Sequence, residues 1–269
     1  MKIHVNGINV HYEYTGRKNA PVVMLCHSLS ATLAMWDAQM AALSERYQVL
    51  RYDLRGHGES DAPSGPYDFD MLAGDAVGLL RALNIARCHF VGLSIGGMIG
   101  QALALNREQE IASLALCATT SRMPIEMQPV WDERIRGAME NGMASLKTGT
   151  LERWFTAGFR ARQPSEVARV GRMIEMTPMP GYAGCAQAIK MLNFTDQLLR
   201  INLPTLLIVG CDDPGTPVAA SQAIQREING AQLSVLDDAM HICNIEQAEG
   251  FNRALLDFLA EQEPRHSLP

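Results

Sequence analysis

Ser94 is the residue whose surroundings point most directly to chemistry. It is the centre of GLSIG (residues 92–96), which directly follows the apolar run Cys88–Leu93 and precedes a helix-like stretch. A sharp turn between strand and helix needs small neighbours, which Gly92 and Gly96 supply, and it lifts the serine hydroxyl clear of the strand. The pattern predicts a nucleophilic serine. The alternative is a glycine-rich turn in which the serine only caps the helix.

A serine hydroxyl needs a base before it becomes an effective nucleophile, and two later loops supply the groups for one. The apolar run Thr205–Val209 is followed by GCDDPGTP, in which the carboxylates are Asp212 and Asp213. The run Leu233–Leu236 is followed by DDAMH, which ends at His241. The histidine would accept the serine proton, and a buried carboxylate would hold the imidazole in the required tautomer. The alternative for the histidine is a place on a surface loop.

The orienting carboxylate is one of two neighbouring aspartates. Asp213 directly precedes Pro214, and a residue before proline is restricted to extended geometry, which suits a side chain that projects inward. Asp212 would then face solvent or cap the turn. Asp237 and Asp238, just before the histidine, are interpreted as turn residues. We therefore favour the aspartate before the proline.

Two backbone amides are expected to stabilise the oxyanion that forms when the serine attacks a carbonyl. The Ile95 N–H would stand at the N-terminus of the helix that follows Ser94. The second donor should come from the loop after the strand Val22–Cys26, where the Leu29 N–H is the candidate. A further loop, DLRGHGES at residues 53–60, is interpreted as structural, with a tight turn and charge pairs that fix it.

Neither a metal nor a cofactor is expected. The seven histidines show no metal-binding spacing such as HExxH, and the six cysteines form no CxxC pair. Cysteines in apolar runs are typical of buried, reduced thiols. Cys26, Cys211 and Cys243 fall near the loops proposed for catalysis, which leaves a role for them there open.

The segments that must position these residues alternate between strands and helices. Strands are predicted at Lys2–Val5, Asn9–Tyr14, Val22–Cys26, Val49–Tyr52, Cys88–Leu93 and Ile111–Cys117, and helices near Trp36–Leu43, Phe69–Leu83 and Ile95–Leu105. Continuous apolar runs such as Val22–Cys26 are typical of strands buried on both faces. The alternation predicts the α/β fold class, with a mostly parallel central sheet flanked by helices.

The alternation of strands and helices stops between about Ser121 and Leu199, where the periodicity is helical and no strand is predicted. It resumes with strands at Thr205–Val209 and Leu233–Leu236 and helices near Ala219–Ile228 and Gln247–Glu261. We therefore predict a core made of residues 1–120 and 200–269 and a helical cap at 121–199. The tail Gln262–Pro269 is expected to be frayed.

The charge and the apolar content of the chain argue against several classes of function. The 269 residues carry a net charge of −6, and no Lys/Arg-rich run is present, which argues against a general nucleic-acid or anionic-membrane binder. The N-terminus lacks the pattern of a signal peptide, and no apolar run approaches the roughly 18 residues of a membrane span. We expect a cytoplasmic enzyme with a small-molecule substrate. The sequence leaves self-association into a homo-oligomer open.

Several of these segments together resemble the α/β-hydrolase superfamily over nearly the whole chain. DLRGHGES, GLSIGG, GCDDPGTP and AMHICNIEQ stand in the order that superfamily uses. More narrowly, HSLSATLAMWDAQM, LERWFTAGF, PGYAGCAQAI and HICNIEQAEGFNRALLDFL resemble bacterial 3-oxoadipate enol-lactonases. LERWFTAGF and PGYAGCAQAI are the more discriminating because they lie in the predicted cap.

The resemblance implies an α/β-hydrolase fold with a helical cap insertion and a triad of Ser94, Asp213 and His241. It also implies an activity: opening of an enol-lactone in the β-ketoadipate pathway of aromatic catabolism, with no cofactor. That family leads us to expect Asn and Gly where this chain has His27 and Ser30. Both departures lie in the loop of the predicted second oxyanion donor.

A lactone of this kind carries a free carboxylate, so an arginine is expected to face the pocket. Arg134 in the predicted cap is the candidate, with Trp131 as an apolar wall. The alternative for Arg134 is a solvated helix face. Trp154 and Phe155 are expected to pack in the core of the cap.

Two other functions stay open. One is a broader carboxylesterase or another lactonase on the same scaffold, and the other is a hydrolase-fold ligand-binding receptor with little turnover. Epoxide hydrolases and dehalogenases of the superfamily fit poorly, because they use Asp where this chain has Ser94.

Overall fold

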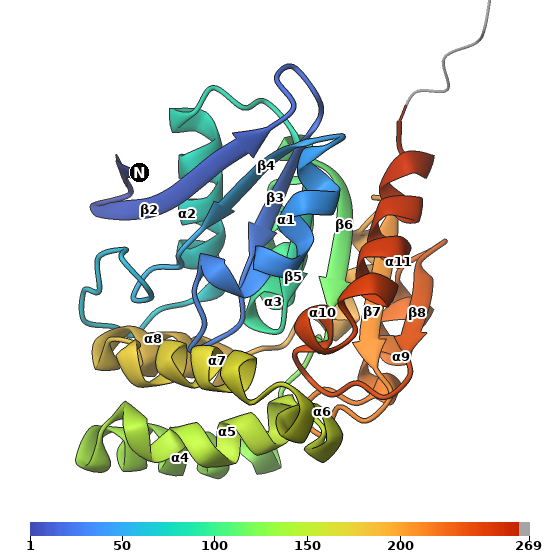
Figure 1. The fold of residues 1–269 in the computed structure, drawn as a ribbon. Coiled ribbons are helices and arrows are strands. Elements are labelled where there is room, and N and C mark those ends of the chain that lie inside the picture. Colours follow the sequence, from blue (N-terminus) through green and yellow to red (C-terminus); the bar gives the residue numbers. More distant parts are fainter. Residues whose placement is uncertain (264–269) are drawn as a thin grey trace, which may run out of the picture.

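An eight-stranded sheet forms the centre of the protein (Figure 1), whose computed structural model describes residues 1–263. Its strands are β1 (Lys2–Val5), β2 (Ile8–Gly16), β3 (Val22–Cys26), β4 (Gln48–Tyr52), β5 (Cys88–Leu93), β6 (Ile111–Cys117), β7 (Thr205–Gly210) and β8 (Gln232–Leu236). They lie in the order β1-β2-β4-β3-β5-β6-β7-β8. The pairs β1–β2 and β2–β4 are antiparallel and the other pairs are parallel, which confirms the predicted mostly parallel sheet.

The central strands are buried along their whole length. Every residue of β3, β5 and β7 is buried, as expected for apolar runs covered by helices on both faces. The observed bounds of β5 and β6 are those that the sequence predicts, whereas β2 is longer than the predicted Asn9–Tyr14. Because the parallel strands run the same way, their carboxyl ends bring the loops with the candidate residues to one edge of the sheet.

Helices cover both faces of this sheet. They are α1 (Asp37–Ser44), α2 (Phe69–Ala82), α3 (Ile95–Asn106), α9 (Val218–Glu227), α10 (Cys243–Glu246) and α11 (Ala248–Glu261). Figure 1 shows α1 and α11 in front of the sheet and α2 and α3 behind it. The predicted helix at Trp36–Leu43 is a 3₁₀ turn followed by α1, and the predicted tail at Gln262–Pro269 lies outside the described residues from 264 onward.

A helical insertion lies between β6 and β7. It contains α4 (Gln128–Asn141), α5 (Lys147–Trp154), α6 (Ala157–Arg162), α7 (Pro164–Met176) and α8 (Met179–Lys190). Figure 1 shows it across the carboxyl ends of the parallel strands. Its two ends are joined at the base, where Met123 N donates to Leu192 O (2.9 Å) and Phe194 N donates to Ser121 O (2.7 Å). The predicted helical insertion is confirmed, and the division into domains at residues 121 and 199 stays a prediction.

Glycines let the insertion approach the core closely. A Cβ atom at Gly181 in α8 would lie 1.9 Å from the carbonyl oxygen of Gly56, and one at Gly184 would lie 2.7 Å from the Tyr67 ring. Gly56 itself has φ +77°, a conformation that side chains disfavour. The segment PGYAGCAQAI therefore carries glycines where α8 rests directly on the loop after β4.

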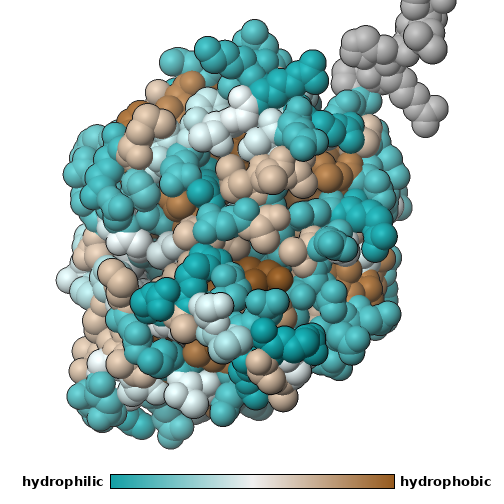
Figure 2. Space-filling model, in the orientation of Figure 1, coloured by the Kyte–Doolittle hydropathy of each residue, from teal (hydrophilic) through white to brown (hydrophobic). Residues whose placement is uncertain are grey.

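The surface that faces the viewer in Figure 2 is mostly hydrophilic, with small, separate hydrophobic patches. Scattered apolar side chains of this kind are ordinary on globular proteins. Within residues 1–263, each helix is either too short or too polar to cross a membrane.

Candidate active site

Ser94 occupies a strained turn between β5 and α3. Its φ is +59°, in the left-handed region that non-glycine residues rarely adopt. A Cβ atom at Gly92 would lie 2.1 Å from Gly96 O, and one at Gly96 would lie 2.3 Å from Cys26 O. The two glycines are therefore required by close backbone contacts on both sides of the serine.

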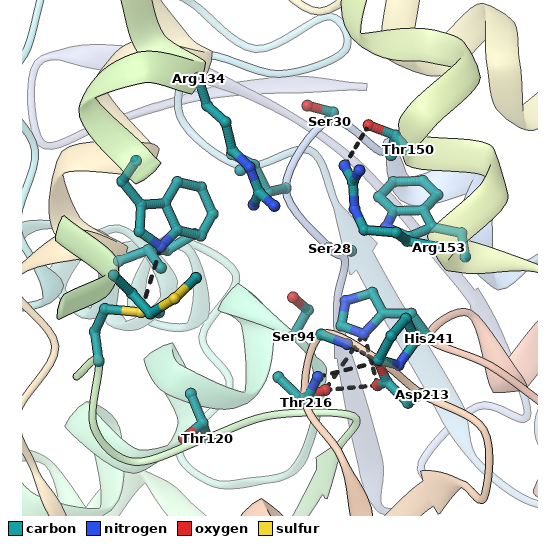
Figure 3. Close-up of a pocket in the computed structure, with 18 of the residues that line it drawn as sticks. Ser28, Ser30, Ser94, Thr120, Arg134, Thr150, Arg153, Asp213, Thr216 and His241 are labelled. Carbon is teal, nitrogen blue, oxygen red and sulfur yellow. Dashed lines mark hydrogen bonds and ion pairs between the residues drawn. The ribbon is translucent and has the colours of Figure 1, made fainter. Parts of the chain in front are cut away.

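Hydrogen bonds hold this turn in place. Ser94 N donates to Cys117 O at the end of β6 (2.8 Å), and Thr119 Oγ1 donates to Ser94 O (2.8 Å). The Ser94 hydroxyl lies in the wall of a cavity, beside the imidazole of His241 (Figure 3). Strain that is fixed by neighbouring strands is typical of functional sites.

His241 and Asp213 meet across two loops. His241 Nδ1 lies 2.8 Å from Asp213 Oδ2, and the side chain of Asp213 is completely buried. A carboxylate only accepts hydrogen bonds, so Nδ1 carries the proton and Nε2 is left as an acceptor on the side of the cavity. This arrangement suits a base for the Ser94 hydroxyl, the role that the sequence predicts for His241.

The structure places Asp213, and not Asp212, against the histidine. Asp213 also accepts hydrogen bonds from Gly215 N (2.8 Å), Thr216 N (3.0 Å) and Thr216 Oγ1 (2.6 Å), whereas Asp212 is exposed. Burial alone would raise the pKa of Asp213, but His241 and these hydrogen bonds hold that pKa below its usual value. Asp213 is therefore a carboxylate at neutral pH.

The two predicted oxyanion donors are the amide of the residue after the serine and the amide of a residue that lines the same cavity. Ile95 N is the first amide of α3, directly after Ser94, and the Leu29 residue lines the cavity. Among residues 1–263, no protein group accepts a hydrogen bond from either amide. The side chain of Ile95 lies in the core and not in the cavity wall, so only its backbone is available to a substrate.

The cavity is built from both the core and the insertion. Its volume is about 620 Å³, and its apolar wall includes Met98, Met123, Met127, Leu146 and Ile189. Trp154, expected to pack in the core of the insertion, is buried and also lines the cavity, with its ring 6.3 Å from that of His241. Phe155 is fully buried and stacks on Phe159, as expected for a packing residue.

Positive charge gathers in this cavity. The Arg134 guanidinium lies 5.0 Å from the centre of the Trp131 ring, and both residues line the cavity. Figure 3 shows Arg134 and Arg153 pointing into the cavity from α4 and α5, above Ser94 and His241. Within residues 1–263, neither arginine forms an ion pair with a carboxylate.

Arg153 is a residue that sequence reasoning missed, although it lies within the LERWF segment. The residue is exposed, and its guanidinium donates weakly to Thr150 Oγ1 at 3.3 Å. Burial and the charge of Arg134 lower the pKa of the Arg153 guanidinium. The two guanidinium groups therefore repel each other, and an anionic ligand between them would relieve that repulsion.

Glu246 is a second residue that the sequence did not reveal. Its buried carboxylate accepts hydrogen bonds from Thr156 N (2.8 Å) and Thr156 Oγ1 (2.5 Å), just before α6. The same carboxylate accepts a hydrogen bond from Met240 N (2.8 Å), next to His241. The glutamate thus ties the insertion to the loop that carries the histidine.

The loop at residues 53–60 is fixed by charge pairs, as the sequence predicts. Arg55 forms a buried ion pair with Asp75 through two contacts of 2.7 Å. Asp53 accepts from His11 Nδ1 (2.8 Å) and from Leu33 N (2.7 Å). In the described part of the chain, no group of three or more His, Cys, Asp or Glu side chains could hold a metal ion.

Because His57 in this loop is buried, the free energy of unfolding is expected to depend on pH. The ring is completely buried, with Nε2 accepting from Ser30 N (3.0 Å) and Nδ1 donating to Arg55 O (3.2 Å). Burial and the neighbouring His27 lower the pKa of His57 from 6.5 to about 3. Between these two values the unfolded chain binds one proton more than the folded chain, so the stability is full above pH 6.5 and falls as the pH falls.

Urea unfolding at several pH values would measure this effect. We expect His57 to contribute a loss of about 1.4 kcal/mol per pH unit in the free energy of unfolding as the pH is lowered from 6.5 toward 5. His57→Gln, which cannot titrate in this range, should show a slope smaller by that amount. Equal slopes in the two proteins would contradict the expectation.

The comparisons with known proteins agree with this architecture. A sequence profile of the alpha/beta hydrolase fold matches residues 21–248. The chain is 34% identical to 3-oxoadipate enol-lactonase 2 of Acinetobacter baylyi over 248 residues, which is 92% of each protein. It is 32% identical to a hydrolase named RutD of Stutzerimonas stutzeri, over 94% of this chain and 97% of the relative.

A solved structure shows the same similarity. The enol-lactonase of Burkholderia xenovorans LB400 superposes with a TM-score of 0.93 at 40% sequence identity, over 97% of this chain and 100% of the other. The fold, including the helical insertion, is therefore shared with relatives that act on lactones.

Proposed function

The chain belongs to the α/β-hydrolase family and resembles its ester and lactone hydrolases, and on this basis we propose that it hydrolyses a small acidic lactone. The most specific form of the proposal is 3-oxoadipate enol-lactone, the substrate named in two of the relatives. The observation that carries the acidic substrate is the pair Arg134 and Arg153, which lack carboxylate partners within residues 1–263 and line the same cavity as Ser94. A neutral ester would leave both charges without a counter-ion.

In the proposed first half-reaction, Ser94 Oγ attacks the lactone carbonyl while His241 Nε2 accepts the hydroxyl proton. Asp213 holds the imidazole in the Nδ1–H tautomer and stabilises the imidazolium that forms. The Leu29 and Ile95 amides donate to the oxyanion. The ring C–O bond then breaks and the His241 imidazolium gives its proton to the expelled enolate, which becomes a ketone. An acyl group remains on Ser94, and His241 is neutral again.

In the second half-reaction, His241 removes a proton from water, and the resulting hydroxide attacks the acyl carbonyl. The same two amides hold the second oxyanion. Ser94 leaves with the proton that His241 returns, and a new carboxylate is released. The chemistry uses only groups of this chain and water.

A panel of substrates tests the proposed function. It compares kcat/KM for 3-oxoadipate enol-lactone, for a neutral p-nitrophenyl ester and for acyl-homoserine lactones. The proposal expects the acidic lactone to be preferred. No preference would favour the broader carboxylesterase or lactonase, for which the RutD relative at similar identity is the supporting observation. Ligand-induced stabilisation without turnover of any member would favour a receptor.

Arg134→Ala tests the role of the positive charge. We expect KM for the anionic lactone to rise about tenfold or more, because a hydrogen bond to a charged group is lost, while KM for a neutral ester changes little. Arg136→Ala is the matched control, since Arg136 lies on the same helix, is exposed and contacts Glu133. Equal changes for the two substrates, or the same change in the control, would remove the proposed role of Arg134.

A further inference from the structure

His27 lies in the same loop as the Leu29 amide, two residues before it. The imidazole is completely buried, and its two nitrogens have different partners. Leu54 N donates to His27 Nε2 (2.9 Å), so Nε2 is an acceptor and the proton must be on Nδ1. His27 Nδ1 therefore donates to Ser28 O, at 2.7 Å. The tautomer of this histidine is fixed by a backbone amide of another loop.

The Ser28 carbonyl and the Leu29 amide belong to one peptide unit. In a planar trans peptide the C=O and N–H bonds point in opposite directions. A donor that fixes the carbonyl on the side of His27 consequently turns the N–H of Leu29 to the opposite side. Leu29 lines the cavity, and no group within residues 1–263 accepts a hydrogen bond from its amide. Donation to the carbonyl also polarises the peptide and strengthens its N–H as a donor.

We propose that His27 is a positioning residue for the oxyanion hole: by donating to Ser28 O, it orients the Leu29 amide toward the oxygen that becomes negative during catalysis. The inference rests on the proposed role of Ser94 as nucleophile, and it assigns to His27 a function that the resemblance, which leads us to expect Asn at this position, does not describe.

The next peptide unit, between Leu29 and Ser30, is fixed by a second buried imidazole. His57 Nε2 accepts from Ser30 N (3.0 Å), and the rings of His27 and His57 lie 5.3 Å apart. Ser30 has φ +61°, a conformation that glycine adopts more easily, and the hydrogen bond that its backbone N–H donates to His57 Nε2 holds it there. The two positions at which this chain departs from the expected Asn and Gly thus belong to one hydrogen-bonded unit around Leu29.

Two conservative substitutions separate the two hydrogen bonds of His27. The amide nitrogen of Asn can take the place of Nδ1 and donate to Ser28 O, and the amide of Gln can take the place of Nε2 and accept from Leu54 N. His27→Asn should therefore keep the oriented peptide, and His27→Gln should lose it. His89→Gln is the control, because His89 is also buried but is hydrogen-bonded to Ser113 in β6 near the start of β5, whereas Ser94 follows the end of that strand.

The experiment measures kcat and KM for a neutral p-nitrophenyl ester and the affinity for a boronic acid, which forms a tetrahedral adduct with a nucleophilic serine. For His27→Gln we expect kcat to fall about 10- to 10³-fold with KM nearly unchanged, and boronate affinity to fall by a similar factor. For His27→Asn both should stay within about fivefold of the unchanged protein, and His89→Gln should alter neither.

Equal losses in His27→Asn and His27→Gln, or a loss confined to KM, would overturn the inference. Failure of both variants to fold would assign His27 to the stability of the fold and would also overturn it. Boronate affinity distinguishes a failure of this inference from a failure of the proposed function. The tetrahedral boronate adduct contacts the oxyanion donors, so its affinity depends on them even if no substrate in the panel is hydrolysed. Absence of any boronate adduct in the unchanged protein would contradict the role of Ser94 itself.

Discussion

Replacing Ser94 with alanine is expected to lower kcat for the proposed acidic lactone by at least about 10⁴-fold while leaving the fold intact. The physical reason is that no other hydroxyl can take the place of Oγ at the strained turn, so only the oxyanion donors and substrate binding remain to accelerate the reaction. Removing the hydroxyl creates no cavity of consequence, and the hydrogen bonds of Ser94 N and Ser94 O are kept. Steady-state kinetics and the melting temperature measure the two parts of this expectation.

Ser221→Ala is the matched control for this variant. Its hydroxyl is buried in α9 and has no hydrogen-bond partner within residues 1–263, so its loss should change neither activity nor stability appreciably. Activity that survives in Ser94→Ala at more than a few per cent would mean that the nucleophile is a different residue.

Replacing Asp213 with asparagine is expected to have the second-largest effect, a loss of about 10⁴-fold in kcat. An amide can donate to His241 Nδ1 and so favours the tautomer in which Nε2 carries the proton and cannot accept another. It also removes the negative charge that stabilises the imidazolium. Because Asp213 accepts four hydrogen bonds in a buried position, some loss of stability should accompany the loss of activity.

Asp212→Asn is the control that the chain itself offers. It makes the same chemical change one residue earlier, at an exposed side chain, and should change kcat by less than about threefold. The reverse order of effects, with the larger loss in Asp212→Asn, would overturn the assignment of the orienting carboxylate.

The strands and the loops of the candidate triad could be predicted from the sequence because the signals are local. A buried parallel strand is a continuous apolar run, and the residue that follows it lies at the carboxyl edge of the sheet whatever the rest of the chain does. Ser94 and Asp213 each follow such a run, and His241 follows the shorter strand-like segment Leu233–Leu236, so residues nearly 150 positions apart were expected at one edge. Pro214 added the local restriction that distinguishes Asp213 from Asp212.

The contacts made by the insertion could not be predicted in this way. Arg153 reaches the cavity only because the insertion places both α4 and α5 over the site, and the amphipathic pattern of a short helix does not specify where its side chains end up. Trp154 was expected in the packing of the insertion, and its second contact, with the cavity, depends on the same arrangement. Glu246 joins two segments about 90 residues apart, and the sequence shows it only as an acidic residue just before the predicted helix near Gln247–Glu261.

The role of His27 likewise depends on a partner that is distant in sequence. A histidine in a sequence can be either a buried structural residue or a catalytic one. Only the amide of Leu54, 27 residues later, fixes which ring nitrogen of His27 carries the proton. The predicted helix ends were also imprecise. The helix predicted to start at Trp36 begins one residue later, after a 3₁₀ turn. Thr32 caps this turn and accepts a hydrogen bond from Ala34 N. Such boundaries depend on single capping contacts and not on periodicity.

Covalent labelling with a serine-directed fluorophosphonate, followed by peptide mass spectrometry, tests the central claim most directly. We expect one adduct per chain, located on Ser94. It should form in the unchanged protein and in Asp212→Asn and form much more slowly in Asp213→Asn and His241→Ala. An adduct on another residue, or no adduct in a folded protein, would contradict the proposal that Ser94 is the nucleophile of this hydrolase.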